Sequence, residues 1–439
     1  MIKNILRYSI AFVVTTIVFL LMLIIFSAIP KEYIKSNLEK SANILMNQTE
    51  SIFIDSNGRN IFNHNSTDAI MLNIIYSIDR DNLFESALRA RRNYIPEVSK
   101  NIFEDIVGNL KFATKKQLLT EEFYDLVNGK TQKVFDYARY WHGYIVILIP
   151  LLLFCDIIGI RIILQVILLI FFVLLMYYIS KKRSWKYSFI YLFVFIAFDL
   201  LAWITTIQGI LVMIIAVAFS TFIAKGKINN KNLNICLFIS GAITAYLDFF
   251  TTPLMAFLLP VITYKLVNLE ETTFVKEMIS IIKNGFVWLF GYFGLWLMKW
   301  VIIDLTLNTN ITKLSFEQII LRIGLDSGPK ANKNLNLFAL FKNCFQAANI
   351  VNVTGFIITF VASIIIILKG KIKNFFKSAK VCYYICTIIP LAWFFIVASH
   401  SEQHYFFTYR TLLITLLGYM LIVFDDRKNK KDKDIKENA

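Results

Sequence analysis

Long apolar runs recur along almost the whole chain, and they constrain its fold more than any other feature. Most of them approach the ~20 residues that an α-helix needs to cross a bilayer. We expect ten such helices, at 8–29, 160–179, 187–203, 205–224, 235–250, 251–267, 285–303, 351–368, 382–399 and 411–424. Barrel strands alternate between apolar and polar residues, and these runs do not, which excludes a β-barrel. The sequence therefore predicts an all-α polytopic membrane protein.

Basic residues collect between alternate runs. A net charge of +16 would suggest nucleic acid in a soluble protein, but here the positive-inside rule accounts for it. The basic segments are 3–7, 181–186, 225–231, 265–283, 369–380 and 427–436. With ten spans they all fall on one side, the cytoplasm. We therefore expect a cell-membrane protein with both termini in the cytoplasm and no nucleic-acid partner.

The assignment of the segments between spans to one side of the membrane or the other also divides the chain into parts. We expect a signal-anchor helix (1–29), a large extracytoplasmic loop with interfacial helices (30–159), a transmembrane bundle (160–424) with a second outer loop (304–350), and a charged cytoplasmic tail (425–439). The apolar run 144–155 is short for a span, and every later basic loop would move outward if it crossed. It is expected to dip into the membrane or lie on it. Residues 268–284 read as a separate amphipathic helix in the cytoplasm.

Two acids in the first loop are candidates for a general base. Asp68 lies in STDAIMLN, where Ser66 or Thr67 would cap a helix that docks on the membrane, and Asp55 lies in IDSNGR. A carboxylate can take the proton of an acceptor hydroxyl. The alternatives are a helix-start carboxylate for Asp68 and a turn role for Asp55.

Cationic and aromatic residues in the same loop are candidates for binding phosphate or sugar. Arg89 and Arg92 lie in LFESALRARRNY, and Arg139 and His142 lie among the aromatics of YARYWHGY. Guanidinium groups suit phosphate because they donate two parallel hydrogen bonds. The alternatives are arginines that face water near lipid headgroups and an aromatic belt at the membrane interface.

The turn between the last two spans, SHSEQHYFFTYR, adds His400, His404 and Arg410 as candidates for binding a lipid phosphate. Two histidines without a third ligand do not predict a metal site. The five cysteines form no disulfide framework. No Walker loop, GxGxxG, HExxH or GxSxG motif is present, so the sequence offers no soluble nucleotide-binding unit.

The layout resembles the GT-C superfamily of integral membrane glycosyltransferases, in which a first span precedes a large extracytoplasmic loop. The runs STDAIMLN, YARYWHGY and HSEQHYFFTYR also look like those of membrane proteins of Gram-positive bacteria linked to surface polysaccharide or teichoic acid. The resemblance implies a polyprenyl-phosphate sugar donor, Asp68 or Asp55 as the acid, and Arg139, His400, His404 and Arg410 as phosphate or lipid contacts. It leaves a divalent-cation cofactor open.

The function expected from these features is sugar transfer at the outer leaflet, from a lipid-linked donor to a cell-surface glycan or lipid. One alternative is a polysaccharide polymerase or ligase, although those enzymes usually have their large loop late in the chain. Another is a transporter or flippase for lipid-linked saccharides, which needs a polar path through the bilayer centre. A non-catalytic scaffold is the third. A structure discriminates by showing whether Asp68, Arg139 and His404 line one cavity.

Overall fold

Helices dominate the structure, a computed structural model that describes residues 2–48, 51–54, 60–62, 65–94, 112–130, 133–226, 228–268, 273–325, 335–348, 350–369 and 380–425. The first part of the chain forms α1 (Ile2–Ser27), α2 (Lys31–Asn47), β1 (Ser51–Ile54), β2 (Asn60–Phe62), α3 (Asn65–Tyr76), α4 (Leu83–Arg89), β3 (Arg91–Tyr94), α6 (Phe112–Val127), β4 (Lys133–Asp136) and α7 (Ile145–Leu152). The strands of this described part form two antiparallel pairs, β1 with β2 and β3 with β4.

The rest of the chain is helical. It forms α8 (Ile157–Lys182), α9 (Trp185–Ala197), the 3-10 turn η1 (Leu200–Thr205), α10 (Ile207–Lys225), α11 (Asn230–Leu247), α12 (Met255–Val267), α13 (Phe274–Leu307), α14 (Ile311–Ile323), α15 (Leu335–Ala347), α16 (Ile350–Lys369), α18 (Lys380–Ile396), α19 (Ala398–Gln403), α20 (Tyr405–Thr408), the 3-10 turn η2 (Tyr409–Thr411) and α21 (Leu412–Phe424).

Ten apolar helices occupy the positions of the ten predicted spans. Among the described residues, six are long and apolar enough to cross a membrane: Ser9–Ser27, Ile157–Lys182, Ile207–Lys225, Phe274–Leu307, Val351–Lys369 and Tyr405–Phe424. The other four are shorter than the ~20 residues of a typical span: Trp185–Ala197, Asn232–Leu247, Met255–Val267 and Lys380–Ile396. The prediction of an all-α membrane protein is thus confirmed at the level of a bundle of apolar helices.

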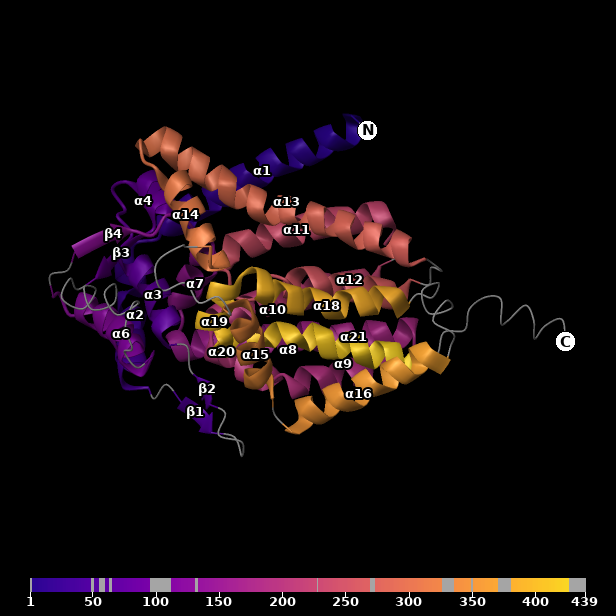
Figure 1. Cartoon of the computed structure of the whole chain (residues 1–439). Coiled ribbons are helices and arrows are strands. Elements are labelled where there is room, and N and C mark those ends of the chain that lie inside the picture. The colour runs from indigo at the N-terminus through magenta and orange to yellow at the C-terminus, as the bar shows by residue number, and fades with distance from the viewer. Residues whose placement is uncertain are drawn as a thin grey trace.

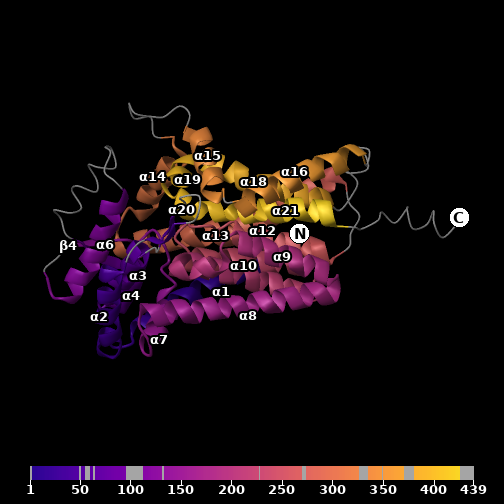
Figure 2. The same ribbon diagram turned by 90° about the horizontal axis from the view of Figure 1, so that it is seen from below.

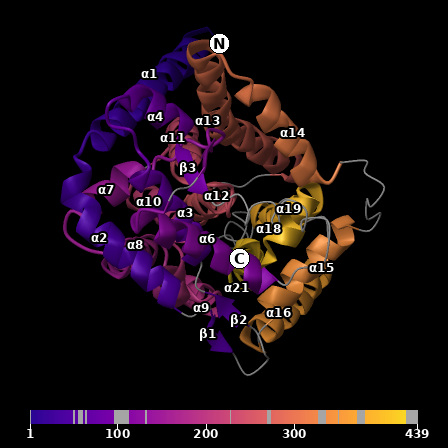
Figure 3. The same cartoon turned by 90° about the vertical axis from the view of Figure 1, so that its left-hand side faces the viewer.

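The bundle has two distinct ends. Figure 1 shows α8 to α13, α18 and α21 side by side with roughly parallel axes, and Figure 2 shows the same arrangement from below. We call the end where α1 begins and α21 finishes the tail end, and the end where α2, α3, α4 and α6 lie the loop end (Figure 1). Figure 3 looks onto the loop end, where α2, α3 and α6 lie in front of the bundle helices. The first loop therefore forms a layer of its own over one end of the bundle.

Two glycines bring α11 and α13 into close contact. A Cβ on Gly241 would lie 2.2 Å from the carbonyl oxygen of Trp288, and one on Gly291 would lie 2.2 Å from the carbonyl oxygen of Phe238. Small residues of this kind let membrane helices approach backbone to backbone, where dispersion forces hold them without a hydrophobic driving force. The close crossing fixes α13, whose far half carries part of the candidate site described below.

Three helix boundaries differ from the prediction. Residues 274–284, predicted as part of a separate helix (268–284), belong to α13, which runs unbroken from Phe274 to Leu307. The predicted span 187–203 ends as an α-helix at Ala197, where Asp199 has a left-handed backbone conformation (φ 59°) and η1 follows. The helix expected from residue 251 starts at Met255. The α-helices of these last two spans are therefore shorter than the apolar runs that encode them.

The apolar run 144–155 forms the helix α7. Its eight residues, at 1.5 Å each, extend about 12 Å, well short of the ~30 Å hydrocarbon core of a bilayer. Pro150 lies inside it. A helix of this length is too short to cross the bilayer, and the position of the run in or on the membrane stays a prediction.

Candidate functional site

The acid of the STDAIMLN run is held in a buried ion pair. Asp68 lies in the first turn of α3 and is 0% exposed. Its Oδ2 accepts hydrogen bonds from Nε (2.9 Å) and Nη2 (2.7 Å) of Arg161 on α8, and its Oδ1 accepts one from the amide of Ile207 (3.2 Å). The Arg161 guanidinium also donates to Asn65 and Gln48. Asp68 therefore joins α3, α8 and the start of α10, and both of its carboxylate oxygens are occupied.

The arginines of the LFESALRARRNY run are paired with acids of the same layer. Arg89 forms ion pairs with Asp136 on β4 and with Glu85 on its own helix. Arg92 forms one with Glu122 on α6, which is 1% exposed. These pairs link α4 and β3 to β4 and α6. Both arginines thus hold the layer together, and their charges are balanced within it.

The backbone of the YARYWHGY run is fixed to α13. The indole Nε1 of Trp300 donates to the carbonyl oxygen of Arg139 (2.8 Å). The buried Nζ of Lys299, one residue before it, donates to the carbonyl oxygen of Tyr140. A lysine and a tryptophan of α13 therefore fix the backbone from which the Arg139 side chain extends.

The second half of that run is fixed just as tightly. Trp141 Nε1 donates to the carbonyl oxygen of Leu295 (2.8 Å), and the amide of Gly143 donates to the carbonyl oxygen of Tyr246 (2.8 Å). A Cβ on Gly143 would lie 2.2 to 2.4 Å from ring atoms of Tyr246, so only glycine fits there without a shift.

His142 holds the turn between these contacts. Its backbone is left-handed (φ 60°), its Nε2 lies 2.7 Å from the carbonyl oxygen of Tyr137, and its Nδ1 lies 3.2 Å from the hydroxyl of Tyr144. Burial lowers the pKa of His142 well below 6.5, and nearby Lys299 lowers it further. The imidazole is therefore neutral at pH 7, with both nitrogens engaged by its own loop.

A cavity of about 200 Å³ lies between this run, α13, α14 and the end of α18. Four of the seven tryptophans of the chain line it, namely Trp288, Trp296, Trp300 and Trp393. Two cations, Arg139 and Arg322, line it as well. Two further lining residues, Leu289 and Ile396, are 45% and 55% exposed, so the cavity lies next to the apolar outside of the bundle.

Arg322, in the last turn of α14, is the site residue that sequence reasoning missed. Its Nη2 donates to the hydroxyl of Tyr140 (2.8 Å), its Nη1 lies 2.5 Å from Nδ1 of His400, and its guanidinium lies over the ring of Phe250 (5.2 Å). None of these neighbours is an acid. The available signal was one arginine at the end of an amphipathic apolar stretch, ITKLSFEQIILRI.

Arg139 is the other cation of the cavity. Its guanidinium lies 4.8 Å from the ring centroid of Tyr137 and 5.5 Å from that of Tyr140. Its Nε is buried without a hydrogen-bond partner among the described residues. A buried donor that lacks a partner costs free energy, which a ligand oxygen would recover. Arg139 and Arg322 thus share Tyr140 as a neighbour. The unpartnered Nε of Arg139 can donate a hydrogen bond to a ligand in the cavity.

His400 and His404 are not among the residues that line the cavity, but His400 contacts the lining residue Arg322 and His404 contacts His400. Their ring centroids are 4.7 Å apart, and His404 stacks on Phe407 at 5.2 Å. Burial lowers the pKa of His400 well below 6.5, and Arg322 lowers it further. Because a guanidinium only donates, Nδ1 of neutral His400 accepts from Arg322 and Nε2 carries the proton. His400 therefore orients Arg322.

The structure brings only some of the predicted site residues together. Arg139 lines the cavity and His400 contacts its other arginine, whereas the lining residues include none of these: Asp68, Arg89, Arg92, His142, His404 and Arg410. Arg410 lies over the ring of Trp203 at 4.6 Å. Asp55 lies outside the described residues. What the cavity offers chemically is an aromatic slot with two guanidinium groups at its wall.

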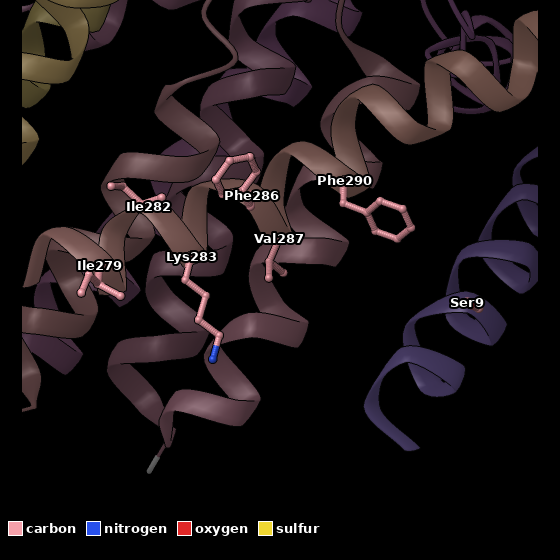
Figure 4. A pocket seen from close by; sticks show the side chains of 7 residues that line it. All are labelled: Ser9, Ile279, Ile282, Lys283, Phe286, Val287 and Phe290. Atoms are coloured by element: carbon pink, nitrogen blue, oxygen red, sulfur yellow. The ribbon is translucent and has the colours of Figure 1, made fainter. Parts of the chain in front are cut away.

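A second cavity, of about 540 Å³, separates α1 from the first half of α13 (Figure 4). Figure 4 shows Phe286 and Phe290 on α13 and Ser9 across from them on α1. Of the lining residues in the described part of the chain, Lys283 alone is ionisable. It is a lipid-facing groove with little polar chemistry.

Comparisons with known proteins identify no relative. No protein-family model matches the chain, and no curated protein and no solved structure matches it either. Among the described residues, no group of three or more His, Cys, Asp or Glu side chains is placed to hold a metal ion.

Proposed function

We propose that this protein transfers a sugar from a polyprenyl-phosphate donor to a cell-surface glycan or lipid, as the resemblance to the GT-C superfamily implies. One observation supports this most: the cavity that combines tryptophan walls, a position next to the apolar outside of the bundle, and the cations Arg139 and Arg322. A lipid-linked sugar has an apolar chain, a phosphate and a flat sugar face. The cavity offers a complementary surface for each of the three.

In the proposed reaction, the hydroxyl oxygen of the acceptor forms a bond to the anomeric carbon of the donor. The bond from that carbon to the phosphate oxygen breaks, and the electron pair leaves with the phosphate. Arg139 and Arg322 stabilise the charge that develops there. No carboxylate belongs to the described lining of the cavity, so we assign the acceptor proton to the leaving phosphate. Asp68 then has a structural role, as its ion pair with Arg161 indicates.

A polysaccharide polymerase or ligase is the second candidate. The grouping of Arg139, Arg322 and His400 around Tyr140 favours it, because such enzymes act at the outer face and use arginine and histidine. Both candidates use a polyprenyl-phosphate donor and the same cavity. They differ in product: an added sugar indicates a transferase, and an added oligosaccharide block indicates a polymerase or ligase.

We further propose that the loop end faces the outside of the cell and that both termini are cytoplasmic. The helices that finish at the tail end carry Lys181 and Lys182 (α8), Lys225 (α10) and Lys369 (α16) in their last turns. Lysine and arginine are enriched in cytoplasmic segments. Labelling a single cysteine at exposed Asp81 and another at Lys182 with a membrane-impermeant maleimide tests this; labelling of the Lys182 position in intact cells would reverse the assignment.

Binding of farnesyl phosphate to the purified protein tests the site itself. Because four tryptophans line the cavity, the ligand should change the intrinsic fluorescence. Hydrogen bonds to a charged group contribute about 1.5–3 kcal/mol each, so R139Q and R322Q should each weaken binding roughly tenfold or more. R91Q removes a paired, partly exposed arginine of the loop layer and serves as the matched control. Equal affinities for all four proteins would refute the proposed site.

A further inference from the structure

Arg410 is a cation that neither the fold nor the cavity accounts for. It lies in η2, just before the last helix, and is only 2% exposed. Its guanidinium lies over the indole of Trp203 in η1, 4.6 Å from the ring centroid. A cation–π contact of this kind recovers less free energy than burial of an unpaired charge costs.

Several polar atoms around Arg410 lack partners. Among the described residues, its Nε and Nη1 have no hydrogen-bond acceptor, and the indole N–H of Trp203 has none either. Oε1 of Gln165, whose Nε2 donates to Leu200 of the same 3-10 turn (3.2 Å), accepts no hydrogen bond. Buried polar groups are nearly always satisfied in folded proteins. The unpartnered donors of Arg410 and Trp203, together with the unpartnered oxygen of Gln165 at the first residue of the same 3-10 turn, therefore indicate a ligand.

The electrostatic potential at the start of α10, next to Arg410, also favours binding of a negative charge. Nη1 of Arg410 lies 3.6 Å from the position of a Cβ on Gly209, in the first turn of α10. A helix start carries about half a positive charge, which disfavours a cation beside it. Asp68 caps this helix through the amide of Ile207, but its charge is balanced by Arg161. The positive potential of Arg410 and of α10 is thus not offset by that acid.

We propose that Arg410 and the indole N–H of Trp203 bind an oxyanion, a phosphate or a carboxylate, at the start of α10. We assign the acceptor oxygen of Gln165, whose amide contacts the same 3-10 turn, to a hydroxyl of the same ligand, so the proposed ligand class is an anionic sugar. This site is distinct from the cavity of Arg139 and Arg322, whose lining does not include Arg410. Assigning the anionic sugar to the acceptor rests on the proposed function, whereas the oxyanion site itself does not.

Thermal unfolding of the full-length protein in neutral detergent tests the site without any transfer assay. Inorganic phosphate and glucuronate should each raise the Tm by about 3 °C or more near saturation, relative to chloride at equal ionic strength. Glucose should not. In an R322Q background, which lacks one phosphate-binding cation of the other cavity, R410Q should abolish the rise, and R410K, which keeps the charge but loses the planar fork, should reduce it. W203F, which keeps a ring under the guanidinium, should weaken it.

R91Q, which removes a paired arginine of the loop layer, is the matched control in the same background and should leave the rise unchanged. Loss of the rise in R91Q, an equal rise in R410Q, or no rise in the R322Q background itself would each contradict the proposed site. A parallel measurement in nanodiscs of phosphatidylglycerol and of phosphatidylcholine separates the sources of the oxyanion. An Arg410-dependent rise with phosphatidylglycerol alone would overturn the acceptor assignment and identify a lipid headgroup instead. Failure of transfer with the rise intact would refute the proposed function only.

Discussion

Replacing Asp68 by asparagine separates a structural role of this acid from a catalytic one. The carboxylate is 0% exposed and accepts two hydrogen bonds from Arg161, whose side chain is 5% exposed. D68N would leave the Arg161 charge buried without its counter-ion, and breaking such a pair costs about 3–5 kcal/mol. With an unfolding entropy of about 2.1 cal/mol/K per residue, a chain of 439 residues shifts its Tm by roughly 1 °C for each kcal/mol, so the Tm should fall by about 3 °C or more.

The assay is thermal unfolding of the detergent-purified protein, followed by tryptophan fluorescence, together with the yield of folded protein. R161Q should destabilise the protein to a similar extent, and the double variant D68N/R161Q by clearly less than the sum of both, because the two residues interact directly. D81N removes an exposed carboxylate of the same layer and should leave the Tm unchanged. A D68N protein with the wild-type Tm but no transfer activity would refute this reasoning and restore Asp68 as the catalytic acid.

Three further outcomes are expected. G143A should lower the Tm by about 1–3 °C, since its methyl group would overlap the ring of Tyr246 and overpacking costs about 1–3 kcal/mol; an unchanged Tm would contradict the tight fit. W300F loses the hydrogen bond to the Arg139 carbonyl and should weaken farnesyl phosphate binding severalfold while leaving most of the stability intact. Burial lowers the pKa of His400 below 6.5, so the unfolded chain binds the extra proton first. Stability should therefore fall as the pH drops through about 6.5, and H400Q should flatten the Tm between pH 7 and 5; equal slopes would contradict this.

The fold was largely predictable because an apolar run of span length can satisfy its backbone hydrogen bonds in a bilayer in very few ways, of which the α-helix is one. The prediction failed where local backbone geometry ends a helix inside an apolar run. Asp199 adopts a left-handed conformation, and the chain then tightens into η1 while its composition stays apolar. Conversely, polar residues at 268–284 suggested a break, yet α13 continues through them from Phe274. Hydropathy alone does not report helix ends of either kind.

The candidate site was predictable only in part. The density of aromatics around Arg139 drew attention to it in the sequence, and the cavity lies there. Arg322 stands alone in its segment, and its neighbours Tyr140 and His400 come from distant parts of the chain. Asp68 looked available for catalysis because its partner, Arg161, is 93 residues away. Such partnerships arise from tertiary packing, which one sequence does not display.

The length of α13 bears on how the protein responds to the membrane around it. Its 34 residues extend about 51 Å, whereas the hydrocarbon core is ~30 Å thick, so the helix must tilt or project into the headgroup region. Its far half supplies the aromatic wall, and α14, which follows it, supplies Arg322. A thicker bilayer would cover more of α13 and bring the guanidinium closer to the hydrocarbon boundary. Reconstitution into lipids of increasing acyl length should therefore tune ligand affinity.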